Sequence, residues 1–481
     1  MKPYTLFLLS LFLACRIYAQ APIAFERYYD FGYTEEGYCV QQTTDRGYII
    51  CGRQGIAVGY QKLLLQKVDS VGNLEWIKLF GSYDEEGYAV KQTFDGGYIV
   101  TGRYTNASYI PRIYLLKTDA NGDTLWTKKI QTTNSWNGYG SDVIQTADSG
   151  YVIIANGGEL TDTVGTSLLI KTNSNGDTLW TKKISRFSGI TLHSLKQLPN
   201  NNFIIAGEVY ISQNPVVSGM YLINTDSIGD TLWTKIHTIL SNNTGVNAVI
   251  LSTDNGYLLR GNIYYQFSNS TDIFLIKTDI TGDTLWTKAI GGLGNEGGGG
   301  AQYTADGGYI ISGTTTSYGA GGADVYLVKI DSLGQTLWSK TFGGINNDAG
   351  NCVQQTIDHG FVISGITSSF GMQNGDVYLI KTDSLGNAPT GISEHLNPTN
   401  NIAVFPNPFV TSATITVSGT NDFSSNTFIL YDYSGRELIH EKMSGSSFTL
   451  EKNDLAAGIY FCTIQSDNGK IIGKAKIIVC Q

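Results

Sequence analysis

Apolar and polar residues alternate along the chain in short runs that predict β-strands and not helices. One stretch illustrates the pattern, with strands expected over residues 88–93, 98–103, 113–117 and 124–130. A turn of the form Thr-x-Asp-x-Gly separates the first strand from the second, and Asp-x-x-Gly-Asp separates the third from the fourth. Aspartate accepts hydrogen bonds within its own turn, and glycine supplies a positive φ angle. No window shows a strong helical period, so an all-β fold is expected.

This four-strand pattern occurs seven times, at a spacing of about 52 residues. The fourth strand carries the clearest marker, which is Gly-Asp-Thr-Leu-Trp-Thr-Lys or a variant of it. Copies of this marker begin at Gly72, Gly122, Gly176, Gly229, Gly282, Gly334 and Gly386, and the last copy has lost its tryptophan. A repeated unit of four strands is typical of a β-propeller blade, whereas β-helices and open solenoids use shorter repeats.

The repeated tryptophan is expected to lie between neighbouring blades, where burial of its large ring stabilises their stacking. Six tryptophans hold this structural, blade-docking position: Trp76, Trp126, Trp180, Trp233, Trp286 and Trp338. The Asp-x-x-Gly-x-x-x-Trp run resembles the tryptophan-docking motif of quinoprotein propellers, with a turn one residue shorter.

The seventh copy lacks its fourth strand, and a segment before the first copy resembles that strand. Residues 25–32 place Phe25 where other copies have tryptophan and Arg27 where they have lysine. A strand donated across the join would close the ring and remove exposed sheet edges. We therefore expect residues 20–390 to form a seven-bladed β-propeller closed by an N-terminal strand.

Beyond a polar linker at residues 391–401 the repeat is absent, and residues 402–481 predict a small Ig-like β-sandwich. Four motifs follow in order: Val404–Phe409, Ile429–Leu438, Leu455–Tyr460 and Gly469–Val479. Together they resemble the type A C-terminal sorting domain of the type IX (Por) secretion system of Bacteroidetes. The residues that carry the sorting motif are Phe405, Pro406, Asn407, Pro408, Gly458 and Tyr460. The resemblance implies type IX machinery as a partner, and a secreted, extracellular or outer-membrane surface protein that passes through the periplasm.

The start of the chain predicts the same route. Lys2, a short apolar run and a small residue at Ala19 are typical of a signal peptide over residues 1–19. No stretch reaches the length of about twenty residues that a membrane span needs. The net charge of -9 and the lack of a basic run argue against nucleic acid as a partner.

No arrangement of residues predicts a metal, a cofactor or a catalytic centre. The histidines are scattered, and neither paired histidines nor Cys-x-x-Cys occurs. Gly292–Gly297 matches a dinucleotide fingerprint by letters but is interpreted as a connector between blades, since no helix follows it. The turn at Asp119–Asp123 is too short for an EF-hand loop and is interpreted as a hairpin. A single pattern repeated many times favours a structural role over catalysis.

Function is expected on the variable loops at the end of the ring opposite the tight turns. Exposed aromatic rings there could stack on sugar rings or anchor a protein. The candidate ligand face comprises Tyr104, Tyr109, Trp136, Tyr210, Tyr264, Tyr265, Tyr318 and Phe370. These features favour a non-catalytic surface protein that binds a glycan or a protein. The alternatives are a polysaccharide hydrolase or lyase, which would need carboxylates to converge, and a structural surface or adhesion element.

Two further sets of residues leave alternatives open. Glu35, Glu36, Glu85 and Glu86 are candidate acids for the enzyme alternative and are interpreted as solvated connectors between blades. Cys39 and Cys51 flank one turn and are a possible disulfide if the hairpin loop centres on Asp45. Two free buried thiols are the other alternative, since export permits disulfides without requiring them.

Overall fold

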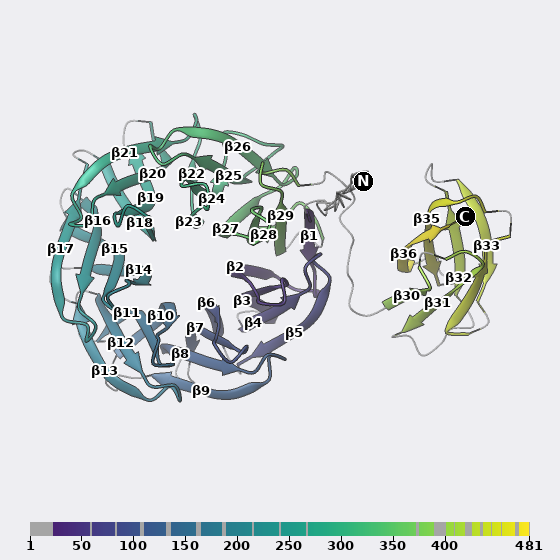
Figure 1. The fold of residues 1–481 in the computed structure, drawn as a ribbon, viewed down its shortest axis with the longest axis horizontal. Helices are drawn as coiled ribbons and strands as arrows, with labels where there is room; N and C mark the ends of the chain where they lie inside the picture. The colour runs from purple at the N-terminus through teal and green to yellow at the C-terminus, as the bar shows by residue number, and fades with distance from the viewer. Residues whose placement is uncertain are drawn as a thin grey trace, which may run out of the picture. The chain divides into compact units, whose positions relative to one another are not determined.

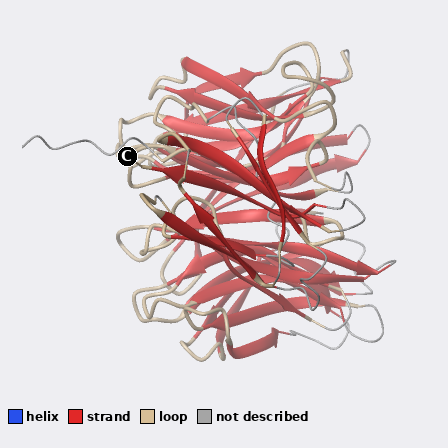
Figure 2. Ribbon diagram, turned by 90° about the vertical axis from the view of Figure 1, so that its right-hand side faces the viewer, coloured by secondary structure: helices blue, strands red, loops and turns tan. Residues whose placement is uncertain are grey.

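The computed structural model contains strands and loops, and the residues it describes include no helix (Figure 2). It describes residues 23–57, 60–81, 84–105, 110–130, 136–159, 165–184, 189–213, 216–239, 242–265, 268–371, 375–388, 401–407, 409–418, 426–432, 436–443, 445–453, 455–466 and 471–480. The signal peptide prediction therefore lies outside the described residues, as does most of the expected linker. The chain divides into two compact units, with the main boundary between Glu394 and His395.

The larger unit is a succession of antiparallel sheets in chain order. The first sheet contains β2 (Glu35–Gln42), β3 (Tyr48–Ala57), β4 (Tyr60–Val68) and β5 (Leu74–Phe80). The second contains β6 (Glu85–Gln92), β7 (Tyr98–Thr105), β8 (Pro111–Thr118) and β9 (Thr124–Ile130). The third contains β10 (Trp136–Gln145), β11 (Tyr151–Glu159), β12 (Thr166–Thr172) and β13 (Thr178–Ile184). The fourth sheet contains β14 (Ile190–Gln197), β15 (Phe203–Gln213), β16 (Val216–Thr225) and β17 (Thr231–His237). The fifth contains β18 (Asn242–Leu251), β19 (Tyr257–Tyr265), β20 (Ser270–Thr278) and β21 (Thr284–Ile290).

The next sheet departs from the simple pattern, because its first strand is split into β22 (Glu296–Gly297) and β23 (Ala301–Tyr303). Both pair with β24 (Tyr309–Thr315), which β25 (Asp324–Ile330) and β26 (Thr336–Phe342) follow. Gly298 and Gly299, which interrupt it, have φ angles of 63° and 73°. The last sheet contains β27 (Asp348–Gln355), β28 (Phe361–Thr367) and β29 (Asp376–Thr382). The prediction of an all-β fold built from repeated four-stranded antiparallel sheets is confirmed.

The sheets follow one another around a ring, with their first strands toward the centre and their fourth strands at the rim (Figure 1). Their middle strands are buried on both faces, as in β4, where Leu63, Leu64 and Leu65 are all inaccessible to solvent. Each hydrophobic cluster joins residues of consecutive sheets, such as Val100 of β7 with Leu65 of β4. A sheet that buries both faces can do so only by stacking on two neighbours.

The turns form as the sequence pattern predicts. In the first sheet Asp45 Oδ1 accepts a hydrogen bond from the Gly47 amide at 2.9 Å, and the Thr43 hydroxyl also donates to it. Gly72, in the turn before the fourth strand, has a φ angle of 84°, which glycine adopts without strain. These local bonds fix the loop lengths and hence the register of each hairpin.

Strand β1 (Phe25–Tyr29) pairs with β29, so the last sheet has the order β1-β29-β28-β27. The predicted pairing of the N-terminal segment with the last repeat is confirmed. The Phe25 ring packs against Gly72 of the first sheet, with a centroid 6.0 Å from that of Tyr48. Side-chain bonds also join the two sheets, because the Gln42 amide donates to Gln354 Oε1 at 2.6 Å.

The C-terminal unit consists of two antiparallel sheets. One has β31 (Ser412–Ser418) between β30 (Asn401–Phe405) and β34 (Ser447–Glu451); the other has the order β33 (Glu437–Lys442), β32 (Thr427–Tyr431), β35 (Gly458–Gln465) and β36 (Ile471–Val479). Both contribute to one hydrophobic cluster, which includes Ile415 and Phe428. The first strand begins at Asn401, one residue before the expected boundary.

Candidate functional site

A bulge recurs in the inner strands of the ring and sets which side chains they present. In β2 the register shifts between Gly37 and Cys39, so Tyr38 is the extra residue. The same shift makes Tyr88 the extra residue of β6. An extra residue bends the strand and redirects its own side chain. The Tyr38 and Tyr88 rings lie 5.6 Å apart across two sheets, and Tyr139 of β10 continues the row at 5.4 Å.

Beside this aromatic row, two arginines and two glutamates form a continuous network. Arg53 Nη2 lies 3.0 Å from Glu36 Oε2, and Arg53 Nη1 lies 3.5 Å from Glu86 Oε1. Arg103 Nη2 contacts Glu86 Oε1 at 3.1 Å, and the Tyr88 hydroxyl donates to Glu86 Oε2 at 2.6 Å. We call Glu36, Tyr38, Arg53, Glu86, Tyr88 and Arg103 the axial cluster. Its members come from β2, β3, β6 and β7, which lie at the inner side of the ring (Figure 1).

The protein environment raises the pKa of the two phenols of the axial cluster. Burial raises the pKa of Tyr38 and of Tyr88; the charges of Glu36 and Glu86 raise the pKa of Tyr38 further, and Glu86 alone does so for Tyr88. Both phenols therefore stay protonated and can donate hydrogen bonds. The Arg53 guanidinium lies 5.8 Å from the centre of the Tyr38 ring, within cation–π range. Its side chain is 30% exposed, so solvent reaches the cluster.

The axial cluster can contact a polar ligand in several ways. It supplies guanidinium and phenol donors, carboxylate acceptors and aromatic faces within a few ångströms. Asn351 of the last sheet extends it, since its Nδ2 donates to Glu36 Oε1 at 3.2 Å. Such a mixture suits a ligand with many hydroxyl groups better than an apolar ligand.

The interpretation of the four glutamates as solvated connectors is wrong. They lie in β2 and β6, and Glu35, Glu85 and Glu86 are almost fully buried. The inner strands begin earlier than expected, because the connectors between sheets are only a few residues long. The motif Glu-Glu-Gly-Tyr at 35–38 and 85–88, with Gly-Arg at 52–53 and 102–103, occurs in two copies alone. That departure from the common repeat is the signal that could have identified the axial cluster.

The candidate ligand face from the sequence is not gathered into one site. Tyr109 and the side chain of Trp136 lie outside the described residues, and the Trp136 backbone begins strand β10 instead of lying in a loop. The other candidates are spread around the ring. Tyr104, Tyr210, Tyr264 and Tyr265 lie in the second strands of three sheets, and Tyr318 and Phe370 lie in the loops after β24 and β28. Several pack locally, as Tyr318 does on Tyr326 at 5.6 Å and Phe370 on Tyr378 at 5.8 Å.

Each repeated tryptophan lies against the glycine of the following copy's turn. A Cβ built at that glycine would lie 2.5 to 3.0 Å from the indole ring, closer than a real side chain permits. The pairs are Trp76–Gly122, Trp126–Gly176, Trp180–Gly229, Trp233–Gly282, Trp286–Gly334 and Trp338–Gly386. Phe25 occupies the corresponding place against Gly72. Each such contact therefore joins two consecutive sheets.

Three buried carboxylates meet near the contact between the first and last sheets. Asp30, Glu35 and Asp376 each offer an oxygen, and these atoms lie within 4.8 Å of one another. Glu35 Oε1 accepts a hydrogen bond from Gln54 Nε2 at 2.7 Å. The sequence showed no such group, because its members are far apart in the chain and no recurrent spacing links them. Acidic side chains also group together without a metal, and we assign none here.

Cys39 and Cys51 are directly opposite each other in β2 and β3, as one of the two sequence alternatives required. Both thiols are nevertheless free, together with Cys352, Cys462 and Cys480. Cys51 Sγ points toward the next sheet, where it donates to the Gly87 carbonyl at 3.3 Å.

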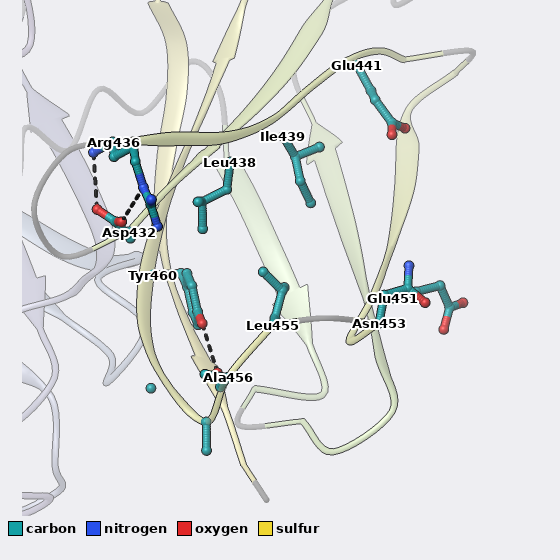
Figure 3. Close-up of a pocket in the computed structure, with 12 residues that line it drawn as sticks. Asp432, Arg436, Leu438, Ile439, Glu441, Glu451, Asn453, Leu455, Ala456 and Tyr460 are labelled. Carbon is teal, nitrogen blue, oxygen red and sulfur yellow. Dashed lines mark hydrogen bonds and ion pairs between the residues drawn. The ribbon is translucent and has the colours of Figure 1, made fainter.

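The C-terminal unit contains an open pocket of about 640 Å³ (Figure 3). Leu438, Ile439 and Leu455 line it, and Tyr460 donates its hydroxyl hydrogen to the Ala456 carbonyl at 2.8 Å. The expected sorting residues are dispersed. Gly458 and Tyr460 line the pocket, and the Asn407 side chain accepts a bond from the Ile478 amide at 2.8 Å. Pro406 is exposed, while Pro408 and the Phe405 side chain lie outside the described residues.

A family model described as the secretion system C-terminal sorting domain matches residues 403–480. The C-terminal unit is a sorting domain. The resemblance that its four motifs carry is thereby confirmed. A sorting domain of this family indicates export to the cell surface or the extracellular space. In the part of the chain that the structure describes, no helix has the length and apolar character to cross a membrane.

Solved structures similar to the chain share little sequence with it. A protein of unknown function from Dyadobacter fermentans is 10% identical, with 75% of this chain and 98% of that chain covered and a TM-score of 0.44. The β-propeller domain of the trilobed protease from Pyrococcus furiosus is 11% identical, with 74% of this chain and 93% of that chain covered and a TM-score of 0.40. A polysaccharide lyase of the ulvan lyase family is 8% identical, with 68% of this chain and 88% of that chain covered and a TM-score of 0.41. A search of curated proteins found no match to the chain.

Proposed function

We propose that this chain is an exported, non-catalytic binding protein that takes a glycan at the axial cluster. In this proposal the larger unit is a seven-bladed β-propeller closed by β1, and the C-terminal unit is an Ig-like sandwich that type IX machinery recognises. The observation that carries the ligand assignment is the network in which Arg53 contacts both Glu36 and Glu86 beside the Tyr38 ring. Arginine, carboxylate and aromatic groups so combined bind sugar hydroxyls and sugar rings.

The absence of catalysis is part of the proposal, and the bonding of the two glutamates supports it. A general acid or base must reach the proton it transfers. Glu86 is instead held by Arg53, Arg103 and Tyr88, and Glu36 by Arg53 and Asn351. Carboxylates bonded in this way serve as hydrogen-bond acceptors.

A glycan array probed with the purified protein tests this function. Arg53→Ala and Tyr38→Ala should each weaken binding about tenfold or more, because both groups would contact the ligand. Lys78→Ala is the matched control, since Lys78 makes an exposed ion pair with Asp123 on the outer strand β5. Wild-type binding by both axial variants would overturn the site, and an array without any bound glycan would overturn the ligand class.

One observation favours a second candidate, a polysaccharide hydrolase or lyase. Glu36 and Glu86 come from neighbouring sheets and converge on one guanidinium, which is the condition the enzyme alternative required. Incubation of a bound polysaccharide with the protein separates the two functions. Release of shorter or unsaturated sugars that Glu86→Gln abolishes would favour the enzyme, and an intact polymer would favour the binding protein.

A further inference from the structure

Three cysteines gather where the first and last sheets of the ring meet. Cys39 and Cys51 belong to β2 and β3 of the first sheet, and Cys352 belongs to β27 of the last sheet. The Sγ atoms of Cys39 and Cys352 are 3.9 Å apart although 313 residues separate them in the chain. All three thiols are free.

Cys39 and Cys352 occupy the same structural position in consecutive sheets. Each directly follows the bulge of its inner strand, between Gly37 and Cys39 in β2 and between Gly350 and Cys352 in β27. Elsewhere in the ring the residues after the bulge are Ala89, Asp142, Ser194 and Ala248. Among these described inner strands, two cysteines therefore face each other at the one junction where the chain's beginning meets its end.

We propose that Cys39 and Cys352 are a modification site, and that a disulfide between them joins the first and last sheets after export. The ring otherwise closes through noncovalent contacts, which are the pairing of β1 with β29, the packing of Phe25 and side-chain bonds such as that of Gln42. A bond between residues so distant in sequence restricts the unfolded chain strongly. Disulfides persist outside the cytoplasm, where the sorting domain directs this protein.

The surroundings of the thiols give each a role in the reaction. Hydrogen bonds from Cys352 and Cys51 lower the pKa of the Cys39 thiol, and the neighbouring Lys91 charge acts in the same direction. Hydrogen bonding to Cys39, together with burial, raises the pKa of Cys352. The thiolate is the nucleophile in thiol–disulfide exchange, so Cys39 is the attacking group in the second step.

The oxidant is a small disulfide, and the reaction balances in two exchanges. Cys352 is half-buried whereas Cys51 is inaccessible, so Cys352 meets the oxidant first. In the first exchange the Cys352 thiol loses its proton as its sulfur bonds to one sulfur of the oxidant, and the other sulfur of the oxidant leaves and takes up that proton as a thiol. The Cys39 thiolate then attacks Cys352 Sγ and displaces the second thiol. The two cysteines lose two protons and two electrons, and the oxidant becomes two thiols.

Oxidation of the purified protein tests the pairing. The full chain without residues 1–19 is reduced, freed of reductant, incubated with oxidised glutathione, and digested without reduction for mass spectrometry. We expect one crosslink between the peptides that contain Cys39 and Cys352, in the wild type and in Cys51→Ser. A crosslink between Cys39 and Cys51, or no crosslink involving Cys39, would overturn the proposal.

Urea unfolding provides a second readout that does not depend on peptide recovery. The oxidised wild type and oxidised Cys51→Ser should unfold at a higher urea concentration than their reduced forms. Cys352→Ser should show the same midpoint under both conditions, since it lacks the second sulfur. Equal midpoints for oxidised and reduced wild-type protein would contradict a bond that joins the ends of the ring.

Discussion

The lysine near the end of the third strand is buried in most sheets, and one aspartate compensates its charge. Lys171 Nζ lies 2.9 Å from Asp148 Oδ2 and donates to the Thr172 carbonyl at 2.9 Å. The same pair recurs as Lys67–Asp45, Lys117–Asp95, Lys277–Asp254, Lys329–Asp306 and Lys381–Asp358. In the fourth sheet both positions are asparagine, Asn200 and Asn224. Where the buried cation is lost, its anion is lost too, as expected if each needs the other.

Asp148→Asn should destabilise the protein by about 1–3 kcal/mol, because it leaves the Lys171 ammonium buried without its anion. The double variant Asp148→Asn/Lys171→Asn reproduces the natural fourth sheet and should recover part of that loss. Urea unfolding of the wild type, both single variants and the double variant measures the coupling. Additive effects of the two substitutions would show that the pair does not act as a unit.

The same pair predicts how stability depends on pH. Burial acts to raise the pKa of Asp148, but hydrogen bonds from Thr146 and Lys171 outweigh it and lower the pKa to about 2. A carboxyl with a lowered pKa in the folded state stabilises the protein above its unfolded pKa, and this contribution is lost as the pH falls. The stability difference between the wild type and Asp148→Asn should therefore shrink between about pH 4 and pH 2. A constant difference across that range would contradict the assignment.

At the scale of a strand, the fourth-strand tryptophan joins consecutive sheets through side-chain packing. Trp286 of β21 packs on Gly334 and belongs to the cluster that contains Tyr309 of the next sheet. Gly334 has a φ angle of 81°, so it serves both the turn and the close approach of the indole ring. Sheet stacking here is a contact between a ring and a turn.

Trp286→Ala should cost about 2–3 kcal/mol, because a partly buried indole leaves a gap between two sheets. Leu285→Ala is the matched control on the same strand, since Leu285 is 59% exposed and should contribute little. Thermal unfolding of both variants and the wild type measures the difference. A melting temperature of Trp286→Ala equal to that of Leu285→Ala would rule out a stabilising role for the indole contact.

Strands, turns and the donated strand could be predicted because each depends on local sequence. Alternation, the Thr-x-Asp-x-Gly turn and the likeness of Phe25 to the repeated tryptophan are visible within a few residues. The axial cluster could not be predicted from local sequence. Glu36, Arg53 and Glu86 meet only after two sheets stack and bulges redirect their strands. The same is true of Cys39 and Cys352, which are close only because the first and last sheets are in contact.

At the scale of the whole molecule, the two units differ in the contacts that stabilise each of them internally. In the larger unit, β1 from one end of the chain pairs with the last sheet, and Phe25 of β1 contacts the first sheet. The sorting domain has its own hydrophobic cluster, which includes Ile415, Phe428 and Tyr460. A unit with its own core can be removed without unfolding its neighbour.

Removal of residues 401–481 should therefore separate folding from export. We expect the shortened chain to fold and to unfold in urea with the midpoint that the larger unit shows in the full chain, since no residue of that unit's hydrophobic clusters is deleted. In the producing cell it should accumulate in the periplasm, because the sorting domain directs passage to the surface. Tyr460→Ala serves as a second variant that keeps the full length of the chain. It removes the hydroxyl bonded to Ala456 and unpacks the core of the sorting domain. Surface delivery of the shortened chain at the wild-type level would show that export does not depend on this domain.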